Sequence, residues 1–197
     1  EAFGSQMQDL GISLVYPEVE RRRPMYYRAK TYNTLVQSGR LQGTVVFLDS
    51  DAIVLKPMGH LPESIGFNVA VTQRFAPNLM PINEGVMIAK ASTQTCINFF
   101  AHYMGTYNLI KDDAIIQRVC GNDLMRWRGG QLSLNAMLDG GKMKSQMSLK
   151  DKNLSILDCL RFNHAVSSWQ QVQSLSKSNN VYIAHIKGKA KIASPSF

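Results

Sequence analysis

The chain has 197 residues, of which 45% are hydrophobic and 18% are charged, so wholesale disorder is excluded and one sizeable core is expected. No apolar run approaches the roughly 20 residues that a membrane span needs. The formal charge of +8 favours anionic partners, but the sequence shows no nucleic-acid-binding motif and no basic residues interleaved with aromatic ones, so nucleic acid is not expected.

The three cysteines, Cys96, Cys120 and Cys159, are widely spaced and form no Cys-x-x-Cys pair. This pattern argues against a disulfide framework or a zinc cage and favours a reducing compartment. We therefore expect a cytoplasmic protein, and leave open a peripheral position at a membrane surface. The first ten residues lack the basic-then-apolar pattern of a signal peptide.

Apolar runs and helix-start signals predict alternating strands and helices along the chain. Short apolar runs predict strands at 11–16, 45–48, 52–55, 67–72, 85–89, 154–157 and 181–184. Helices are predicted from Met25 to Ser38, with Pro24 suited to the first turn, from Ser92 or Thr93 onward, from Asp112 or Asp113 through Val119, and over 132–138. The aromatic side of the second helix is interpreted as core. Residues 139–153 and 165–180 are interpreted as variable loops.

This alternation predicts an α/β fold, with a mostly parallel, Rossmann-like mixed sheet flanked by helices. We find no internal repeat and no linker that would divide the chain, so residues 1–197 are expected to form a single domain. The run Val45–Leu48 is interpreted as a strand buried on both faces of the sheet.

Two acidic residues, Asp49 and Asp51, follow this central strand directly. Ligands of open α/β sheets bind beyond the carboxyl ends of the strands, and residues two apart on an extended chain point the same way. Two adjacent carboxylates suit Mg²⁺ or Mn²⁺. The alternative is an ordinary turn, since Asp and Ser are common turn residues.

Four short motifs give the chain a family resemblance from about residue 12 to 191. The motifs are Tyr27-Arg28-Ala29-Lys30 leading into Phe47-Leu48-Asp49-Ser50-Asp51, then Asn83-Glu84-Gly85-Val86-Met87, Gln131 with Leu134-Asn135, and His185-Ile186-Lys187-Gly188-Lys189-Ala190-Lys191. With these motifs the chain resembles metal-dependent, nucleotide-sugar-using glycosyltransferases of the two-subdomain A-type fold, and is most similar to the retaining group of glycogenin and bacterial lipopolysaccharide galactosyltransferases.

The resemblance implies roles for these residues. It implies His185 as a third metal ligand beside Asp49 and Asp51, with Mn²⁺ or Mg²⁺ as the cofactor. Residues implied in binding the donor, expected to be a UDP-sugar, are Arg28, Lys30, Asn83, Gly188 and Lys191. Fixed cationic groups and a metal would neutralise the leaving diphosphate. The amides of Asn83 and Gln131 suit sugar hydroxyls.

The chain departs from the family pattern at two places. Gly130 stands where the family usually has an Asp that is a candidate for assisting the reaction, so Gln131 and Glu84 are our candidate catalytic residues, with Asp139 as a further candidate. Only about two dozen residues precede Arg28, and they fit the second strand of that fold better than the nucleotide-binding first strand. We expect either a longer natural chain or an incomplete base pocket, whose open sheet edge would permit homo-oligomers.

The expected activity is transfer of a sugar from a nucleoside diphosphate to an acceptor hydroxyl, with retention at the anomeric carbon. The acceptor, a glycan, lipid or protein, is left open. The alternative is a non-catalytic relic of the same fold that binds a glycan or a partner protein.

Overall fold

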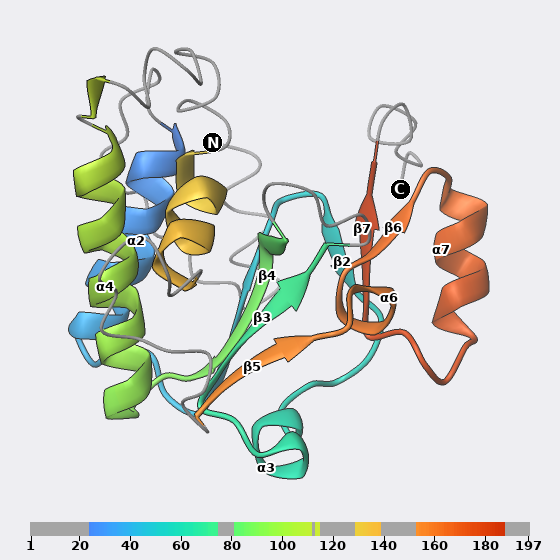
Figure 1. Ribbon diagram of the computed structural model, residues 1–197. Coiled ribbons are helices and arrows are strands. Elements are labelled where there is room, and N and C mark those ends of the chain that lie inside the picture. The colour runs from blue at the N-terminus through green and yellow to red at the C-terminus, as the bar shows by residue number, and fades with distance from the viewer. Residues whose placement is uncertain (1–23, 75–80, 112, 115–128, 139–152, 188–197) are drawn as a thin grey trace, which may run out of the picture.

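The computed structural model describes residues 24–74, 81–111, 113–114, 129–138 and 153–187. Helices and strands alternate in it as the sequence predicts (Figure 1). The elements are α2 (Pro24–Gln37), β1 (Thr44–Leu48), β2 (Ala52–Val54), α3 (Leu61–Ile65), β3 (Val69–Gln73), β4 (Ile82–Lys90), α4 (Gln94–Lys111), β5 (Leu154–Leu157), α6 (Cys159–Phe162), β6 (His164–Val166), α7 (Trp169–Ser176) and β7 (Ile183–Ile186). Residues 129–138 are also helical. The predicted elements at 11–16 and 113–119 lie wholly or largely outside the described residues, as does most of the predicted loop at 139–153.

The described strands form two mixed sheets, with the orders β1-β4-β3-β5 and β2-β7-β6. The pairs β3–β5 and β6–β7 are parallel, whereas β1–β4, β3–β4 and β2–β7 are antiparallel. The predicted α/β fold with a mixed sheet is confirmed. Parallel pairing is less frequent than expected, because β4 runs antiparallel to both of its neighbours.

One face of the four-stranded sheet is covered by α2, α4 and the helix at 129–138, which lie together in Figure 1. The aromatic side chains of Phe99, Phe100 and Tyr103 on α4 are fully buried against this face, which confirms their prediction as core. The expectation that β1 is buried on both faces of the sheet is wrong: Phe47 is buried, but the other residues of the strand are half-buried. Among the described strands, β1 has β4 as its one neighbour, so it is less enclosed than a central strand.

The smaller sheet carries α7 on its outer side (Figure 1). The expected loop at 165–180 is therefore wrong over residues 165–166, which belong to β6, and over residues 169–176. The side chain of Ser168 caps α7 by accepting a hydrogen bond from the backbone N–H of Gln171. Val172 is buried with Val166, while most of the polar side chains of the helix face solvent. A polar composition thus hid a short amphipathic helix.

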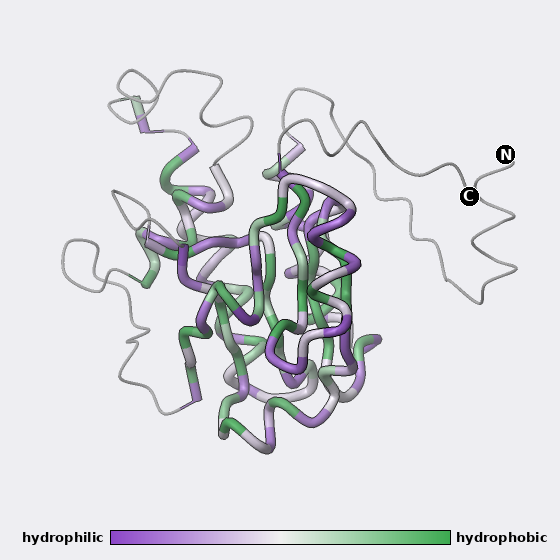
Figure 2. The backbone as a smooth tube through the Cα atoms, turned by 90° about the vertical axis from the view of Figure 1, so that its right-hand side faces the viewer, coloured by the Kyte–Doolittle hydropathy of each residue, from purple (hydrophilic) through white to green (hydrophobic). Residues whose placement is uncertain are grey.

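Hydrophobic and hydrophilic residues are interleaved along the described chain (Figure 2). Within that part of the chain, no helix combines the length and apolar character needed to cross a bilayer.

Candidate metal and nucleotide site

A tight turn after β1 carries the two acidic residues of the site. The backbone N–H of Ala52 donates to the carbonyl of Asp49 over 3.0 Å, and the N–H of Asp49 donates to the carbonyl of Gly85 over 2.9 Å. Asp49 and Asp51 therefore come from a turn and not from the extended segment that we expected. The turn and the paired carboxylates, treated above as alternatives, occur together. This turn also connects the two sheets, because β2 follows it immediately.

Strand β7 brings His185 to this turn. In the antiparallel pairing of β2 and β7, His185 lies opposite Ala52, and the N–H of Ile186 donates to the carbonyl of Asp51 over 2.8 Å. The Nε2 atom of His185 is 2.9 Å from Asp51 Oδ1 and 3.8 Å from Asp49 Oδ2. One ligand atom from each of the three residues lies within 4.8 Å of the others, a spacing that suits a single metal ion.

The imidazole of His185 is fixed by a chain of hydrogen bonds behind it. Its Nδ1 lies 2.7 Å from Oδ1 of Asn163, whose amide nitrogen donates to the hydroxyl of Thr72 over 3.0 Å. Because that amide oxygen can only accept, Nδ1 carries the proton and the lone pair of a neutral ring is on Nε2, facing the carboxylates. Burial, reinforced by the charge of Lys187, lowers the pKa of His185 below its usual value, which favours this neutral form.

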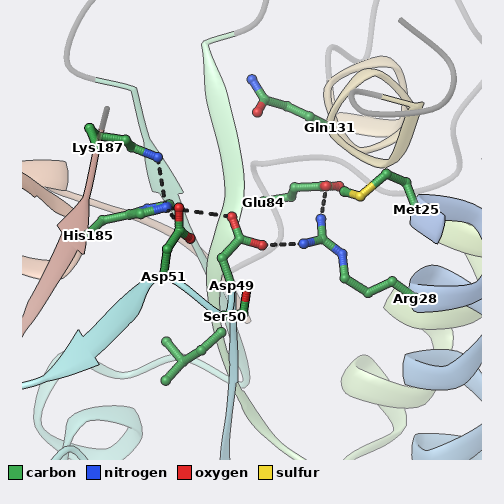
Figure 3. A pocket seen from close by; sticks show the side chains of 10 residues that line it. Met25, Arg28, Asp49, Ser50, Asp51, Glu84, Gln131, His185 and Lys187 are labelled. Carbon is green, nitrogen blue, oxygen red and sulfur yellow. Dashed lines mark hydrogen bonds and ion pairs between the residues drawn. The ribbon is translucent and has the colours of Figure 1, made fainter. Parts of the chain in front are cut away.

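A second polar cluster lies on the other side of Asp49. The guanidinium of Arg28, from α2, forms ion pairs with both Asp49 and Glu84 (Figure 3). The hydroxyl of Tyr103 donates to the other carboxylate oxygen of Glu84 over 2.8 Å, and both side chains are buried. Glu84 is thus held from two sides.

Gly130 lies directly against this carboxylate. A Cβ atom at position 130 would approach Glu84 Oε2 closer than any real contact allows and would be 2.6 Å from the hydroxyl of Tyr103. The Glu84 carboxylate therefore fills the space that a side chain at position 130 would need.

Gly85 allows the turn and β7 to approach β4 closely. A Cβ at this position would be 2.7 Å from Asp49 Oδ2 and 2.9 Å from His185 Cε1. The side-chain oxygen of Asn83 accepts a hydrogen bond from the N–H of Gly85 over 2.7 Å. The amide of Asn83, for which we expected a role in donor binding, thus contacts the backbone of its own strand.

The two clusters line one pocket with a volume of about 520 Å³. Six predicted residues line it: Arg28, Asp49, Asp51, Glu84, Gln131 and His185. Two others do not line it, since Asn83 is directed to its own strand and the exposed Lys30 has its Nζ 5.9 Å from the centre of the Tyr27 ring. Gly188, Lys191 and Asp139 lie outside the described residues.

The sequence did not identify Lys187, Asn163 and Tyr103 as parts of the site. Lys187 was within a quoted motif, but at a position with no assigned role. Tyr103 belonged to an aromatic helix face that is correctly core, and nothing near Asn163 pointed to the imidazole. Only the tertiary structure reveals these three residues.

The charges that line the pocket are nearly balanced. Arg28 and Lys187 are cationic, whereas Asp49, Asp51 and Glu84 are anionic, so one net negative charge remains when His185 is neutral. A divalent cation would make the pocket positive by one charge, which suits an anionic diphosphate.

The comparisons place the fold in a known class. No protein-family model and no curated protein matches the chain. Among solved structures it is similar to a glycosyltransferase involved in the glycosylation of the major capsid of PBCV-1, with 11% identity and a TM-score of 0.51, covering 96% of this chain and 87% of that one. It is also similar to mouse xyloside xylosyltransferase 1 in its apo form, with 14% identity and a TM-score of 0.43, covering 87% and 67%.

The α/β fold with mixed sheets thus matches that of A-type glycosyltransferase structures. The narrower resemblance to the retaining glycogenin group stays a prediction.

Proposed function

We propose that the protein is a metal-dependent glycosyltransferase that moves a sugar from a nucleoside diphosphate, expected to be UDP, to an acceptor hydroxyl with retention of configuration. The observation that carries this proposal is the meeting of Asp49, Asp51 and His185 at the edge of a polar pocket in a glycosyltransferase-like fold. The acceptor would be a glycan, a lipid or a protein.

The residues fit a divalent cation. Two carboxylate oxygens and one neutral imidazole nitrogen form a mixed oxygen and nitrogen ligand set, which suits Mn²⁺ and, with more water ligands, Mg²⁺. Asn163 presents the imidazole in the ligating tautomer. When bound, the cation would help neutralise the charge that develops on the leaving diphosphate.

The cationic side chains of the pocket would act on the same diphosphate. Arg28 has a planar guanidinium suited to two parallel contacts with phosphate oxygens. Lys187 adds a second cation at the opposite side of the acidic turn (Figure 3). Gly188 and Lys191, expected from the resemblance to approach the diphosphate, follow β7 directly in the sequence.

Glu84 and Gln131 are proposed to act on the donor sugar. Both line the pocket on the Arg28 side, and the Gln131 side chain points toward it in Figure 3. Glu84 offers a carboxylate next to Gly130, where the resembled family usually carries an Asp. Its contacts with Tyr103 and Arg28 would fix that carboxylate against the sugar, as positioning or acid–base chemistry requires.

The test is isothermal titration of the protein with Mn²⁺ and UDP. We expect UDP to bind in the presence of Mn²⁺, and Asp51→Asn to abolish the Mn²⁺-dependent part. Glu63→Gln, which removes an exposed carboxylate on α3, is the matched control and should bind like the wild type. No binding of UDP by the wild type at millimolar concentration would contradict the proposal.

The second candidate is a non-catalytic relic that uses the same pocket for binding only. The observation that favours it is Gly130, which supplies no carboxylate. Release of UDP from UDP-sugars separates the two candidates. Slow release that disappears in Asp51→Asn supports an enzyme, whereas binding of UDP without any release supports the relic.

A further inference from the structure

The ammonium group of Lys187 lies among the candidate metal ligands. Its Nζ is 2.7 Å from His185 Nε2, the same atom that lies 2.9 Å from Asp51 Oδ1. Figure 3 shows the end of the Lys187 side chain directed toward His185 from the pocket side. The nitrogen that a metal ion would use is therefore already contacted by a cation that belongs to the chain.

The ammonium of Lys187 and a metal ion would both need the one lone pair of His185 Nε2. Asn163 accepts the proton on Nδ1, so Nε2 offers a single lone pair. A lysine ammonium has three donors and no acceptor, and thus donates to that lone pair. A divalent cation bound by His185 would need the same lone pair, so the ammonium and the metal cannot both hold it.

The backbone of Lys187 is anchored while its side chain is exposed. Its N–H donates to the carbonyl of Val166 over 2.8 Å, and the preceding residue, Ile186, is hydrogen-bonded to Asp51. The residue as a whole is exposed, and four rotatable bonds separate the ammonium from this anchor. The ammonium can therefore leave Nε2 without any change in β7 and still remain beside the pocket.

We propose that Lys187 competes with the divalent cation for His185 and thereby couples metal binding to nucleotide binding. This inference rests on the proposed function, because it takes Asp49, Asp51 and His185 as the metal ligands. A diphosphate in the pocket offers the displaced ammonium a new anionic partner. Nucleotide binding then favours metal binding, and metal binding favours nucleotide binding by the same factor.

The experiment measures the affinity for Mn²⁺ by isothermal titration, with and without UDP, in the wild type and in Lys187→Met. We expect Lys187→Met to bind Mn²⁺ alone about tenfold more tightly, and UDP to increase the Mn²⁺ affinity of the wild type more than that of the variant. Lys177→Met is the matched control: it removes an equal charge from the exposed end of α7, and its affinity should stay within about twofold of the wild type.

The possible failures can be told apart. Unchanged or weaker Mn²⁺ binding in Lys187→Met, with binding still abolished by Asp51→Asn, overturns the competition and leaves the metal site standing. An equal gain in Lys177→Met reduces the effect to general charge and also overturns it. An equal UDP effect in wild type and Lys187→Met overturns the coupling. No Mn²⁺ binding in any variant, with or without UDP, removes the metal site and this inference with it.

Discussion

The carboxylate of Glu84, which lines the pocket, occupies the space that a side chain at position 130 would need. One residue is on β4 and the other is in the helix at 129–138, so the relationship links two elements that contact each other beside the pocket. It also places the carboxylate of Glu84 beside position 130, where the family resemblance led us to expect an Asp.

The first prediction concerns Gly130→Ala. The new Cβ would collide with Glu84 and Tyr103, and neither can move easily because Glu84 is paired with Arg28 and Tyr103 is buried. We expect the free energy of unfolding to fall by about 1 to 3 kcal/mol, as measured by urea denaturation.

Gly105→Ala is the matched control for this substitution. Gly105 is exposed on α4, and apart from its chain neighbours and the adjoining helix backbone no atom lies within 4 Å of the position of its missing Cβ. Alanine there should stabilise the protein by about 0.5 to 1 kcal/mol. The double variant Glu84→Ala with Gly130→Ala should recover part of the loss. Equal effects of alanine at 130 and 105 would contradict the proposed steric relationship.

The second prediction concerns Glu84→Gln. The amide keeps the size of the side chain but removes the charge that faces Arg28 and the pocket. We expect release of UDP from the donor to slow by about 10² or more, because a positioned acid–base or charged group is lost. Mn²⁺ affinity, measured in parallel, should change little, since Glu84 is not among the three clustered ligands. Wild-type turnover in this variant would exclude Glu84 from the reaction.

The third prediction concerns Asn163, which hydrogen-bonds the candidate metal ligand His185. In Asn163→Ala the imidazole of His185 loses the acceptor for its Nδ1 proton, so Nε2 is no longer held as the lone-pair nitrogen. We expect Mn²⁺ affinity to fall by about 10- to 100-fold. Asn68→Ala is the control, because Asn68 precedes the far end of β3 and hydrogen-bonds Asn153 instead. It should leave Mn²⁺ binding unchanged, and a similar loss in both variants would indicate general destabilisation.

The fourth prediction is a pH dependence of stability. The pKa of His185 in the folded protein lies below 6.5, chiefly because of burial and also because of the charge of Lys187. Between the two pKa values the unfolded chain binds more protons than the folded one, so the free energy of unfolding rises with pH in that interval. The contribution is complete above pH 6.5 and is lost as the pH falls through the pKa of the folded state.

Urea denaturation of metal-free protein at several pH values tests this dependence. The wild type should lose stability as the pH falls below 6.5, and His185→Gln should show a weaker dependence over the same interval. An identical pH dependence in both proteins would exclude His185 as its source.

The sequence was informative where a local pattern has a single structural solution. A strand at 45–48 and a helix beginning near Pro24 are present as predicted, although β1 is less buried than expected, and the aromatic face of α4 is core as predicted. The sequence was less informative about strand direction, which depends on pairing between distant segments. The sequence also missed α7, because its three inward side chains, Trp169, Val172 and Leu175, stand among polar residues in a short segment.

The acidic pair and the histidine could be selected from the sequence only because several motifs occurred in order. Their contacts could not be derived in that way, because the antiparallel register of β2 and β7 decides which side chain of β7 meets the turn. A shift of one residue along β7 would direct His185 to the other face. The partners Asn163 and Lys187 depend on the same register.

The turn at Asp49 to Ala52 joins the two sheets, and this has a mechanical consequence. A cation held there would clamp the last described strand, β7, to the first third of the chain, although no covalent crosslink connects them. Chelation should therefore loosen β6, α7 and β7 before the four-stranded sheet. Limited proteolysis in the presence of a chelator would then release the C-terminal portion first. The ion would thus stabilise the attachment of the smaller sheet in addition to any part it takes in the reaction.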